Sequence, residues 1–446
     1  MDTDAFLVAA GGFRASGAHL ANTGAWTVRV NGSVVSSYDA GLTLDTGNTG
    51  ASMITVGAEG SVRGGDFGML VGSSAIIQNA GTISGSTFAG IYLVGTGAHT
   101  ITNTWILEGA YGILDQGGPN NDTVTNSGTI MGSVALGDGH DTFTNVRTVG
   151  GLTTSGIVHG TIDLGDGNDK LTGGASAETV QDNDGSDTVV LGDGDDTWIG
   201  VGATTGPGGG DGLDVINGGT GLDTYDATGS TAGIEINLDG VAHDLAPFAP
   251  GAFRVAARTV DGDYVAGAGA DTVISIENVK GGSGADIVYG STAGNVIEGN
   301  GGSDFLFGYG GNDRLNGGAS SDNLVGGTGR DVLVGGAQAD FFHFTTSTDS
   351  GTTADARDLV TDFEDGWDAI ALDRIDAKVG IAANDAFTFI GTDVAFRGQA
   401  GELRAVHTST GLRVQGDVNG DGRADFAIDI ADASYAITLT GADFSL

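Results

Sequence analysis

The chain has no cysteine, only three lysines and only four prolines among its 446 residues. Without cysteine there is no disulfide framework and no thiol chemistry, so another interaction must stabilise a chain of this size. Basic residues number 17 against 57 acidic ones, which gives a formal net charge of -40. This charge disfavours nucleic acid and anionic lipid as partners, since both attract basic surfaces, and it favours bound cations.

Long apolar runs are also missing from the sequence. No stretch approaches the roughly 18 residues of a membrane span, so we expect no transmembrane segment. The first residues are acidic and the first basic residue is Arg14, whereas a secretory signal begins with a basic region. We therefore expect a soluble chain without an N-terminal export signal.

Glycine, in contrast, is abundant, with 84 of 446 residues, where roughly 7 % is usual. Much of it lies in nine-residue repeats. From Gly281 seven units follow one another, the first being GGSGADIVY and the last GGAQADFFH. An earlier block of seven begins at Leu164 with LGDGNDKLT, and a further unit, LGDGHDTFT, precedes it. The sixth places hold Asp286, Asp304, Asp313, Asp322, Asp331 and Asp340 in the later block, and Asp141, Asp169, Asp187, Asp196, Asp214 and Asp223 in the earlier one.

Each unit is expected to form a turn followed by a short strand. Two or three glycines in five residues allow positive φ, and the last three places are extended around one inward apolar side chain. Two units form one coil, so acids 18 residues apart stack on one edge. These are Asp286, Asp304, Asp322 and Asp340 on one edge, and Asp313 and Asp331 with Asn295 on the other. Stacked carboxylates, about 4.8 Å apart, repel one another unless a cation lies between them. Carboxylate oxygens, together with carbonyl groups of glycines such as Gly281 and Gly284, predict several Ca²⁺ ions.

The unit resembles the RTX nonapeptide of calcium-binding parallel β-rolls, G-G-x-G-x-D-x-U-x, where U is apolar. The alternative is a disordered Gly/Asp-rich linker, but disorder does not require a period of nine with an apolar residue two places after each acid. Glu178, Thr205 and Asn295 replace the Asp of the sixth place. At those turns we expect weak calcium binding or none.

The N-terminal third has a longer period. Its matching places, Gly60, Gly81, Trp105 and Gly128, lie 21, 24 and 23 residues apart, with short apolar runs between Asn and Gly corners. This pattern predicts a right-handed parallel β-helix, against the alternative of a β-sandwich with coincidental spacing. The expected class is therefore all-β, a β-solenoid in which an N-terminal parallel β-helix continues into a calcium-binding parallel β-roll. The predicted domains are a β-helix with an N-terminal cap (1–135), a first roll block (136–226), a strand-and-loop insertion (227–280), a second roll block (281–343) and a C-terminal β domain (344–446).

The last hundred residues resemble the C-terminal domain of serralysin-type (M10) secreted proteases. The resemblance is carried by Arg357–Phe363, Gly366–Leu372, Phe387–Gly391 and Gly416–Phe426. It implies an uncleaved C-terminal signal for type I secretion, and hence an ABC-type transporter as a partner. This domain also holds a D-x-N-x-D-G sequence typical of calcium loops, for which the alternative is a turn without metal. Its candidate ligands are Asp362, Asp368, Asp417, Asn419, Asp421 and Asp425.

No familiar catalytic motif accompanies these repeats. The protease motif His-Glu-x-x-His is absent from the sequence, as is the nucleophile elbow Gly-x-Ser-x-Gly. The rival enzymatic interpretation is a β-helix polysaccharide lyase or epimerase, for which Asp66, Tyr92 and Asp115 come from neighbouring coils. We therefore expect no catalytic residues, although this alternative stays open.

The expected function is that of a secreted, non-catalytic protein that folds on Ca²⁺ binding outside the cell and has a structural, adhesion or matrix role. The alternative is a secreted enzyme that modifies polysaccharide. Expected partners are calcium ions, the type I secretion apparatus, and cell-surface or matrix polysaccharide, with neither nucleic acid nor a membrane span. The expected location is extracellular, with attachment to the cell surface as a further option.

Overall fold

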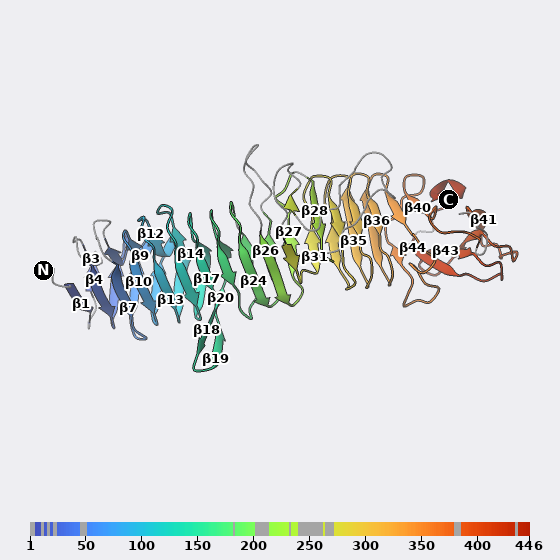
Figure 1. Cartoon of the computed structure of the whole chain (residues 1–446). Coiled ribbons are helices and arrows are strands. Elements are labelled where there is room, and N and C mark those ends of the chain that lie inside the picture. The colour runs from blue at the N-terminus through green and yellow to red at the C-terminus, as the bar shows by residue number, and fades with distance from the viewer. Residues whose placement is uncertain are drawn as a thin grey trace. The chain divides into compact units, whose positions relative to one another are not determined.

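A computed structural model describes residues 5–9, 13–15, 18–20, 25–44, 51–181, 183–200, 214–231, 233–239, 262–263, 272–378, 385–432 and 436–446. Their regular secondary structure is β-strand, apart from one short 3₁₀ helix, η1 (Gly441–Asp443). Within these residues no helix has the length and apolar character needed to cross a membrane. The chain divides into two units, Met1–Thr224 with Asp271–Ser275, and Tyr225–Ala270 with Ile276–Leu446 (Figure 1).

The first unit is a β-solenoid in which each coil adds one strand to a long parallel sheet. The strands of this sheet, in spatial order, are β1 (Ala5–Ala9), β4 (Trp26–Val30), β7 (Ser52–Val56), β10 (Ala75–Asn79), β13 (Thr100–Asn103), β15 (Thr123–Asn126), β17 (Thr142–Thr144), β22 (Lys170–Thr172), β24 (Thr188–Asp193), β26 (Val215–Thr220) and β30 (Thr272–Ile274). One apolar side chain per strand stacks on the next in register. This column consists of Val28, Ile54, Ile77, Ile101, Val124, Phe143, Leu171, Val189 and Ile216. Each is at most 1 % exposed, so the column forms the core.

The other strands of the first unit complete the coils. They are β2 (Phe13–Ala15), β3 (Ala18–Leu20), β5 (Ser33–Ser36), β6 (Leu42–Leu44), β8 (Ser61–Gly64), β9 (Phe67–Val71), β11 (Thr82–Gly85), β12 (Ala89–Leu93), β14 (Ile106–Asp115), β16 (Thr129–Ala135), β20 (Ile157–Val158), β21 (Thr161–Asp163), β23 (Thr179–Gln181) and β25 (Thr197–Ile199). They also pair in parallel, as β8 does with β11. The long coils confirm the predicted parallel β-helix, and the short coils that follow belong to the first nonapeptide block.

An antiparallel hairpin that the sequence analysis did not predict interrupts the first block. It consists of β18 (Val146–Val149) and β19 (Leu152–Ser155) and projects from the coil (Figure 1). Gly150 and Gly151 form its turn with φ of 60° and 84°, a backbone conformation that glycine adopts most readily.

The second unit contains the other nonapeptide block. One of its parallel sheets contains β28 (Ile234–Asn237), β32 (Ile287–Tyr289), β34 (Phe305–Phe307), β36 (Asn323–Val325), β38 (Phe341–His343), β40 (Ala369–Ala371) and β45 (Phe444–Ser445). A second run of parallel strands contains β31 (Asn278–Lys280), β33 (Val296–Glu298), β35 (Arg314–Ala319), β37 (Val332–Ala337) and β39 (Leu359–Val360). The inward residues of the repeat, Val288, Leu306, Leu315, Leu324 and Leu333, are fully buried.

The C-terminal domain is attached to this roll through a shared strand. Strand β44 (Phe426–Ala431) pairs in parallel with β39 and antiparallel with β43 (Gly411–Asp417), and β43 pairs with β42 (Glu402–His407). Strand β41 (Thr388–Thr392) lies beside β42. The domain is therefore all-β, as predicted.

Strands also occur in the segment 227–280, which the sequence analysis describes as an insertion. Strand β28 pairs with β32, β30 with β26, and β31 with β33, each in parallel. Short β29 (Gly262–Asp263) lies antiparallel to β28, and β27 (Thr224–Asp226) spans the point in the sequence where the units divide. Parts of this segment thus extend the nonapeptide sheets.

Candidate calcium sites

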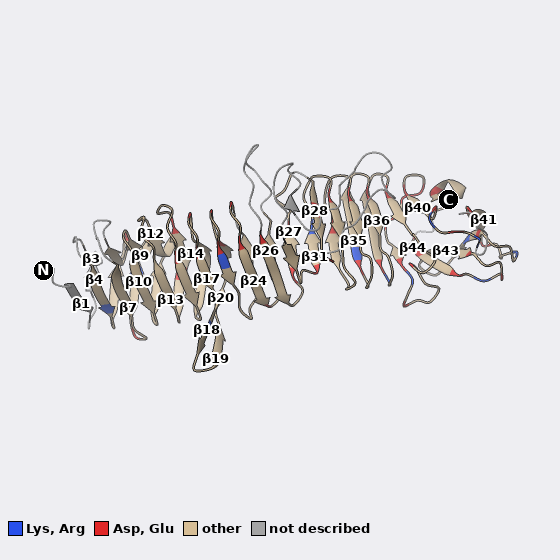
Figure 2. Cartoon of the chain, viewed as in Figure 1, with Lys and Arg blue, Asp and Glu red and all other residues tan. Residues whose placement is uncertain are grey.

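In the second unit, the acids of one edge form a hydrogen-bonded row. Oδ1 of Asp304 accepts the backbone N–H of Asp286 at 2.7 Å, and the same bond joins Asp322 to Asp304 at 2.8 Å and Asp340 to Asp322 at 2.9 Å. Acidic residues in this unit accordingly gather where strands meet turns (Figure 2). The row has the 18-residue spacing that the repeat predicts.

The opposite edge has a second row, which continues past the last repeat. Oδ1 of Asp313 accepts the N–H of Asn295 at 2.7 Å, and Asp331 accepts that of Asp313 at 2.8 Å. Asp358 then accepts the N–H of Asp331 at 2.8 Å. The sequence analysis missed Asp358, although it follows Asp331 by 27 residues, or three repeats, and precedes the fully buried Val360 by two places.

The second carboxylate oxygen of most of these acids accepts no hydrogen bond. The side chains concerned belong to residues at most 3 % exposed. These Oδ2 atoms belong to Asp304, Asp313, Asp322, Asp331, Asp340 and Asp358 in the second unit, and to Asp141, Asp169, Asp187 and Asp196 in the first. A buried acceptor without a partner costs about 1–3 kcal/mol, and more when it is charged. Ten such oxygens in regular rows therefore indicate a bound cation.

In the second unit, the glycine at the first place of the repeat lies against this oxygen. A Cβ atom at Gly299 would lie 2.2 Å from Oδ2 of Asp304, and one at Gly326 would lie 2.3 Å from Oδ2 of Asp331. The second place of these turns has positive φ even where it is not glycine, with 66° at Asn300. At these two turns a side chain at the first place would fill the space beside the carboxylate, whereas the repeats of Asp169 and Asp196 begin with leucine.

Burial raises the pKa of these carboxyl groups. The pKa is about 8 for Asp304 and about 7 for Asp322, because desolvation outweighs the backbone hydrogen bond and neighbouring acids add to the rise. For Asp358 the pKa rises to about 9, through desolvation first and the charge of Asp331 second. Rows of such acids ionise together only beside a cation. Oxygen donors at flexible turns suit Ca²⁺ better than Mg²⁺, so the residues present fit calcium.

The first unit has a row of the same kind. Asp169 accepts the N–H of Asp141 at 2.6 Å, Asp187 accepts that of Asp169, and Asp214 accepts that of Asp187 at 2.8 Å. The hydrogen bond between Asp187 and Asp214 joins residues 27 apart, whereas the regular spacing is 18. The repeat around Thr205 therefore contributes no residue to this row. Thr205 itself lies outside the described residues. The row thus continues at the next aspartate of the sequence pattern, Asp214, which supplies a carboxylate.

The other edge of the first block ends in two acids. Oδ1 of Asp196 accepts the N–H of Glu178 at 2.6 Å, and Oδ1 of Asp223 accepts that of Asp196 at 2.9 Å. Glu178 accepts from the side chains of Ser176 and Asn145 at 2.7 and 2.8 Å. Protein side chains thus bind the carboxylate of Glu178, whereas Oδ2 of Asp196 has no hydrogen-bond partner.

Two turns of the second unit are closed by their own backbone. Oδ2 of Asp286 accepts the N–H of Gly282 at 2.8 Å, and Oδ1 of Asn295 accepts the N–H of Ser291 at 2.8 Å. The candidates Gly281 and Gly284 belong to the turn of Asp286. Their part in calcium binding therefore stays a prediction.

The predicted loop of the C-terminal domain is also closed by internal hydrogen bonds. The two oxygens of Asp417 accept N–H groups of two glycines at 2.6 and 2.9 Å, and Oδ1 of Asp425 accepts from Nδ2 of Asn419 at 2.6 Å. Oδ1 of Asp421 accepts the N–H of Arg423 at 2.8 Å. The four candidates thus share one loop, but these hydrogen bonds explain its geometry without a metal.

Asp362 and Asp368 lie beside the last coil of the second unit. Asp362 accepts the N–H groups of Gly335 and Gly336 at 3.0 and 2.8 Å. Asp368 accepts those of Asp340 at 2.9 Å and Glu364 at 2.8 Å, so it is the residue that follows Asp340 in the row of acids. Both candidates are therefore part of the edge at which the row ends.

The residues considered for a polysaccharide-modifying enzyme do not share one face. Tyr92 is half-buried on the outer surface, where its ring stacks on Phe67 with centroids 4.7 Å apart. Asp115 is 4 % exposed and pairs in register with the inward Leu93. Asp66 accepts the hydroxyl of Thr87 at 2.5 Å. These three residues thus do not form an acid/base pair.

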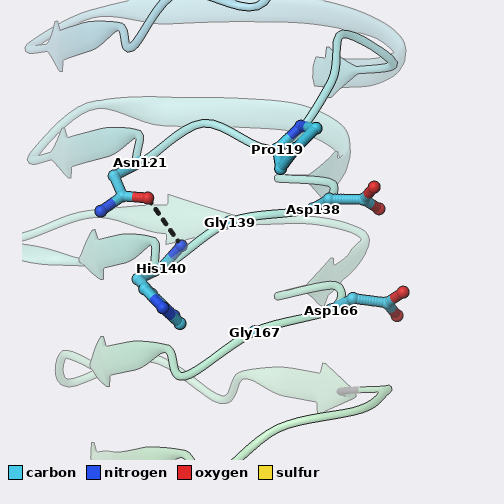
Figure 3. A pocket seen from close by; sticks show the side chains of 7 residues that line it. All are labelled: Pro119, Asn121, Asp138, Gly139, His140, Asp166 and Gly167. Carbon is cyan, nitrogen blue, oxygen red and sulfur yellow. Dashed lines mark hydrogen bonds between the residues drawn. The ribbon is translucent and has the colours of Figure 1, made fainter.

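A hollow of about 340 Å³ lies over the turns of the first block (Figure 3). It is lined by Pro119, Asn121, Asp138, Gly139, His140, Asp166 and Gly167. The backbone N–H of His140 donates to Asn121 Oδ1 at 3.1 Å, and the ring Nδ1 accepts the N–H of Asn168 at 2.7 Å. His140 therefore serves the stacking of turns.

Two family models match the sequence. The model of the RTX calcium-binding nonapeptide repeat matches residues 163–197 and 280–315, and the model of the peptidase M10 serralysin C-terminal region matches residues 301–439. The chain carries RTX calcium-binding repeats and a serralysin C-terminal domain. Neither model describes a protease domain, and the matched RTX segments contain acids of both candidate rows.

Comparison with curated proteins gave no match. Among solved structures, the solution structure of the AlgE6R3 subunit from the Azotobacter vinelandii mannuronan C5-epimerase is 24 % identical over 36 % of this chain and 78 % of that chain. Its TM-score is 0.18. This likeness carries no argument about the function of the RTX protein.

Proposed function

We propose that this RTX protein is secreted, folds on binding Ca²⁺ outside the cell, and has a non-catalytic role in adhesion or in an extracellular matrix. The observation that supports this most strongly is the regular rows of buried carboxylates with unpaired Oδ2 atoms. The proposed calcium ligands are Asp141, Asp169, Asp187, Asp196, Asp214, Asp223, Asp304, Asp313, Asp322, Asp331, Asp340 and, in addition, Asp358. When bound, calcium supplies the positive charge that lets these carboxylates remain ionised while buried.

Charge explains why folding would wait for the extracellular space. A chain with a net charge of -40 repels itself and stays expanded where calcium is scarce. At about millimolar calcium, typical of extracellular sites, the binding free energy becomes folding free energy. The serralysin C-terminal domain supports export by a type I system, because related proteins carry their secretion signal there.

A calcium titration followed by circular dichroism at low ionic strength tests this function. We expect a transition from coil to β-structure, after which the folded form releases neither reducing ends nor unsaturated products from a panel of polysaccharides. Nonapeptide blocks that are ordered in excess chelator at pH 8 contradict the calcium part. Degradation of a polysaccharide contradicts the non-catalytic part.

A pair of glycine variants makes the titration specific to the turns. Gly326→Ala places a Cβ atom 2.3 Å from Oδ2 of Asp331 and is expected to raise the calcium concentration at the midpoint. Gly229→Ala is the matched control, because no atom lies within 4 Å of its Cβ position. Equal midpoints for the two variants would argue against calcium at this turn.

Polysaccharide binding without catalysis is favoured by one group of aromatic side chains. Phe67, Phe88, Tyr92 and Tyr111 lie together on neighbouring coils, with ring centroids 4.7–6.1 Å apart. Phe88 is 38 % exposed, and aromatic faces of this kind suit the apolar faces of sugar rings. Phe88→Ala should weaken retention on an immobilised polysaccharide that the wild type binds, and unchanged retention would exclude this surface.

A further inference from the structure

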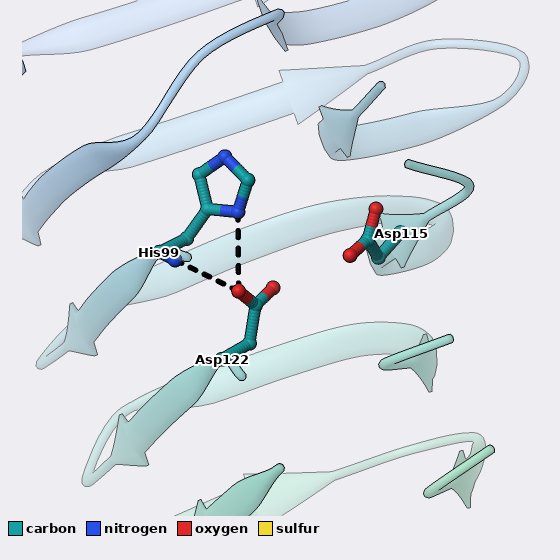
Figure 4. A group of neighbouring side chains, drawn as sticks. All are labelled: His99, Asp115 and Asp122. Carbon is teal, nitrogen blue, oxygen red and sulfur yellow. Dashed lines mark hydrogen bonds and ion pairs between the residues drawn. The ribbon is translucent and has the colours of Figure 1, made fainter. Parts of the chain in front are cut away.

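The β-helix of the first unit contains a buried cluster that the repeats do not explain. His99 precedes β13, Asp115 ends β14 and Asp122 precedes β15, so consecutive coils bring the three side chains together (Figure 4). One ligand atom from each lies within 4.8 Å of the other two. The three residues are 1 %, 4 % and 1 % exposed. The stacking of coils thus places an imidazole and two carboxylates in one buried site.

The histidine ring is held in one tautomer by the backbone. Its Nε2 atom lies 3.2 Å from the carbonyl oxygen of Ser73, which can only accept, so Nε2 carries the proton. Its Nδ1 atom therefore faces the acids and lies 3.2 Å from Oδ1 of Asp122. Histidines that ligate metals through one ring nitrogen usually donate from the other to a backbone carbonyl in this way.

Two buried oxygens, one in the cluster and one in a residue bonded to it, have no hydrogen-bond partner. They are Oδ2 of Asp122 and Oδ1 of Asn120, in residues that are 1 % and 6 % exposed. Nδ2 of Asn120 donates to Oδ2 of Asp115 at 3.0 Å, which ties the amide to the same cluster. Figure 4 shows the carboxylate of Asp115 beside that of Asp122. Unpartnered acceptors next to two buried acids require a positive charge.

The cluster occupies the first rung of the row that continues into the nonapeptide block. Oδ1 of Asp122 accepts the N–H of His99 at 2.8 Å, and Oδ1 of Asp141 accepts that of Asp122 at 2.6 Å. His99 therefore stands where later coils carry an acid. Calcium and magnesium select oxygen donors, whereas imidazole with carboxylates suits zinc and its neighbours in the first transition series.

We propose that His99 Nδ1, Asp115 and Asp122 bind one divalent transition-metal ion, with zinc as the best-fitting species, at a site separate from the calcium sites. Nδ2 of Asn120 holds the carboxylate of Asp115 at this site by its hydrogen bond of 3.0 Å. The ion joins two consecutive coils. At this end of the row a histidine takes the place of an aspartate, so the ligands are one nitrogen and carboxylate oxygens, and a transition metal replaces Ca²⁺. The site is structural, since its ligands are buried.

The test uses the full chain, folded in excess Ca²⁺ so that oxygen-only sites are filled. Co²⁺ is titrated as a spectroscopic probe, and Zn²⁺ retained after gel filtration is counted by elemental analysis. The wild type should develop visible Co²⁺ absorption and retain about one Zn²⁺ per chain. Absence of both results in the folded wild type overturns the proposal and leaves His99 and Asp122 as a buried hydrogen-bonded pair.

Two variants assign the site, and a third is the control. His99→Gln and Asp122→Asn should each lower affinity for Zn²⁺ by at least the roughly 10–100-fold that loss of an outer-shell partner costs. His159→Gln should bind like the wild type, because His159 is exposed. Retention of Zn²⁺ by both ligand variants, with wild-type circular dichroism in Ca²⁺, places the ion elsewhere and overturns the assignment. Folding on Ca²⁺ alone is measured separately, so either outcome leaves the proposed function independently testable.

Discussion

The asparagine row and the aspartate row of the first unit share one coil geometry but satisfy their polar groups differently. Along the β-helix, Nδ2 of Asn79 donates to Oδ1 of Asn103, Asn103 to Asn126, and Asn126 to Asn145, each at 2.8 Å. These four residues are at most 1 % exposed. In the aspartate row, by contrast, each Oδ1 accepts a backbone N–H, whereas the Oδ2 of residues such as Asp169 accepts nothing.

The difference follows from the chemistry of the two side chains. An amide has both a donor and an acceptor, so each asparagine in a stack can hydrogen-bond to the next. An ionised carboxylate can only accept, so stacked aspartates cannot bond to one another in this way. At the nonapeptides, acids replace the asparagines of this edge. Nδ2 of Asn145 donates to the carboxylate of Glu178, and the N–H of Glu178 donates to Oδ1 of Asp196. The asparagine edge of the β-helix is therefore satisfied without an ion, whereas the aspartate rows of the nonapeptide coils need one.

The largest effect is expected from pH in the absence of calcium. Burial raises the pKa of Asp331 to about 6, of Asp313 to about 7 and of Asp304 to about 8, from an ordinary value of 3.8. The calcium-free roll binds more protons than the unfolded chain, so its stability is greatest below about pH 4 and is lost as pH rises through 6 to 8. Circular dichroism of calcium-free protein should show more β-structure at pH 5 than at pH 8.

Calcium should reverse this dependence. Because Ca²⁺ competes with protons for the same oxygens, its apparent affinity should rise from pH 5 to pH 8, and binding near pH 7 should release protons into a weak buffer. Calcium-free β-structure that increases with pH would contradict the assignment of these carboxyl groups as buried and uncompensated.

Conversion of the amide row to an acid should have the next largest effect. Asn103→Asp removes the donor to Asn126 and sets two acceptors against each other in a buried site, which should cost about 3–5 kcal/mol of unfolding free energy. Denaturant unfolding in saturating Ca²⁺ measures this loss. Asn121→Asp is the control, because Asn121 is exposed and uses only its Oδ1. Similar losses of unfolding free energy for both variants would contradict the claim that the buried asparagine row stabilises the β-helix.

The reverse conversion should change sign with calcium. Asp304→Asn removes one buried charge, so in chelator it should stabilise the second unit by about 1 kcal/mol or more. In Ca²⁺ it should weaken binding, because an anionic ligand is lost. Thermal unfolding in both conditions measures the two effects. A loss of stability in both conditions would show that Asp304 is a structural residue only.

The smallest effect is expected in the C-terminal loop. Asp421 is exposed and accepts the N–H of Arg423 at 2.8 Å, a bond that an amide oxygen can also accept. Asp421→Asn should therefore change stability in Ca²⁺ by less than about 0.5 kcal/mol. A large drop in thermal stability that additional Ca²⁺ reverses would show that this loop binds calcium.

The sequence predicts those features that repeat. The period of nine identifies the rows, because the acid and the apolar residue two places later recur together, as in Asp304 and Leu306. The same rule reaches Asp358 and Val360, but the irregular stretch that follows the last repeat conceals them. The hairpin around Gly150 and Gly151 has a local signal in its glycine pair, but its strands lie outside the nine-residue period and so do not follow from it.

The sequence does not predict features that arise only from stacking. His99, Asp115 and Asp122 lie 16 and 7 residues apart and match no ligand spacing, so only the length of each coil brings them together. Likewise, Thr205 occupies a sixth place in the sequence, but the bond from Asp187 to Asp214 shows that the row passes over it. Such outcomes depend on which turns carry a carboxylate.

Hydrogen–deuterium exchange with and without calcium tests the central claim most directly. Peptides from residues 51–135, which contain the asparagine row, should be protected to a similar extent in Ca²⁺ and in excess chelator at pH 8. Peptides from residues 299–343, which contain the unpaired carboxylates, should be protected in Ca²⁺ and exchange rapidly in chelator. Equal protection of residues 299–343 in both conditions would contradict the account.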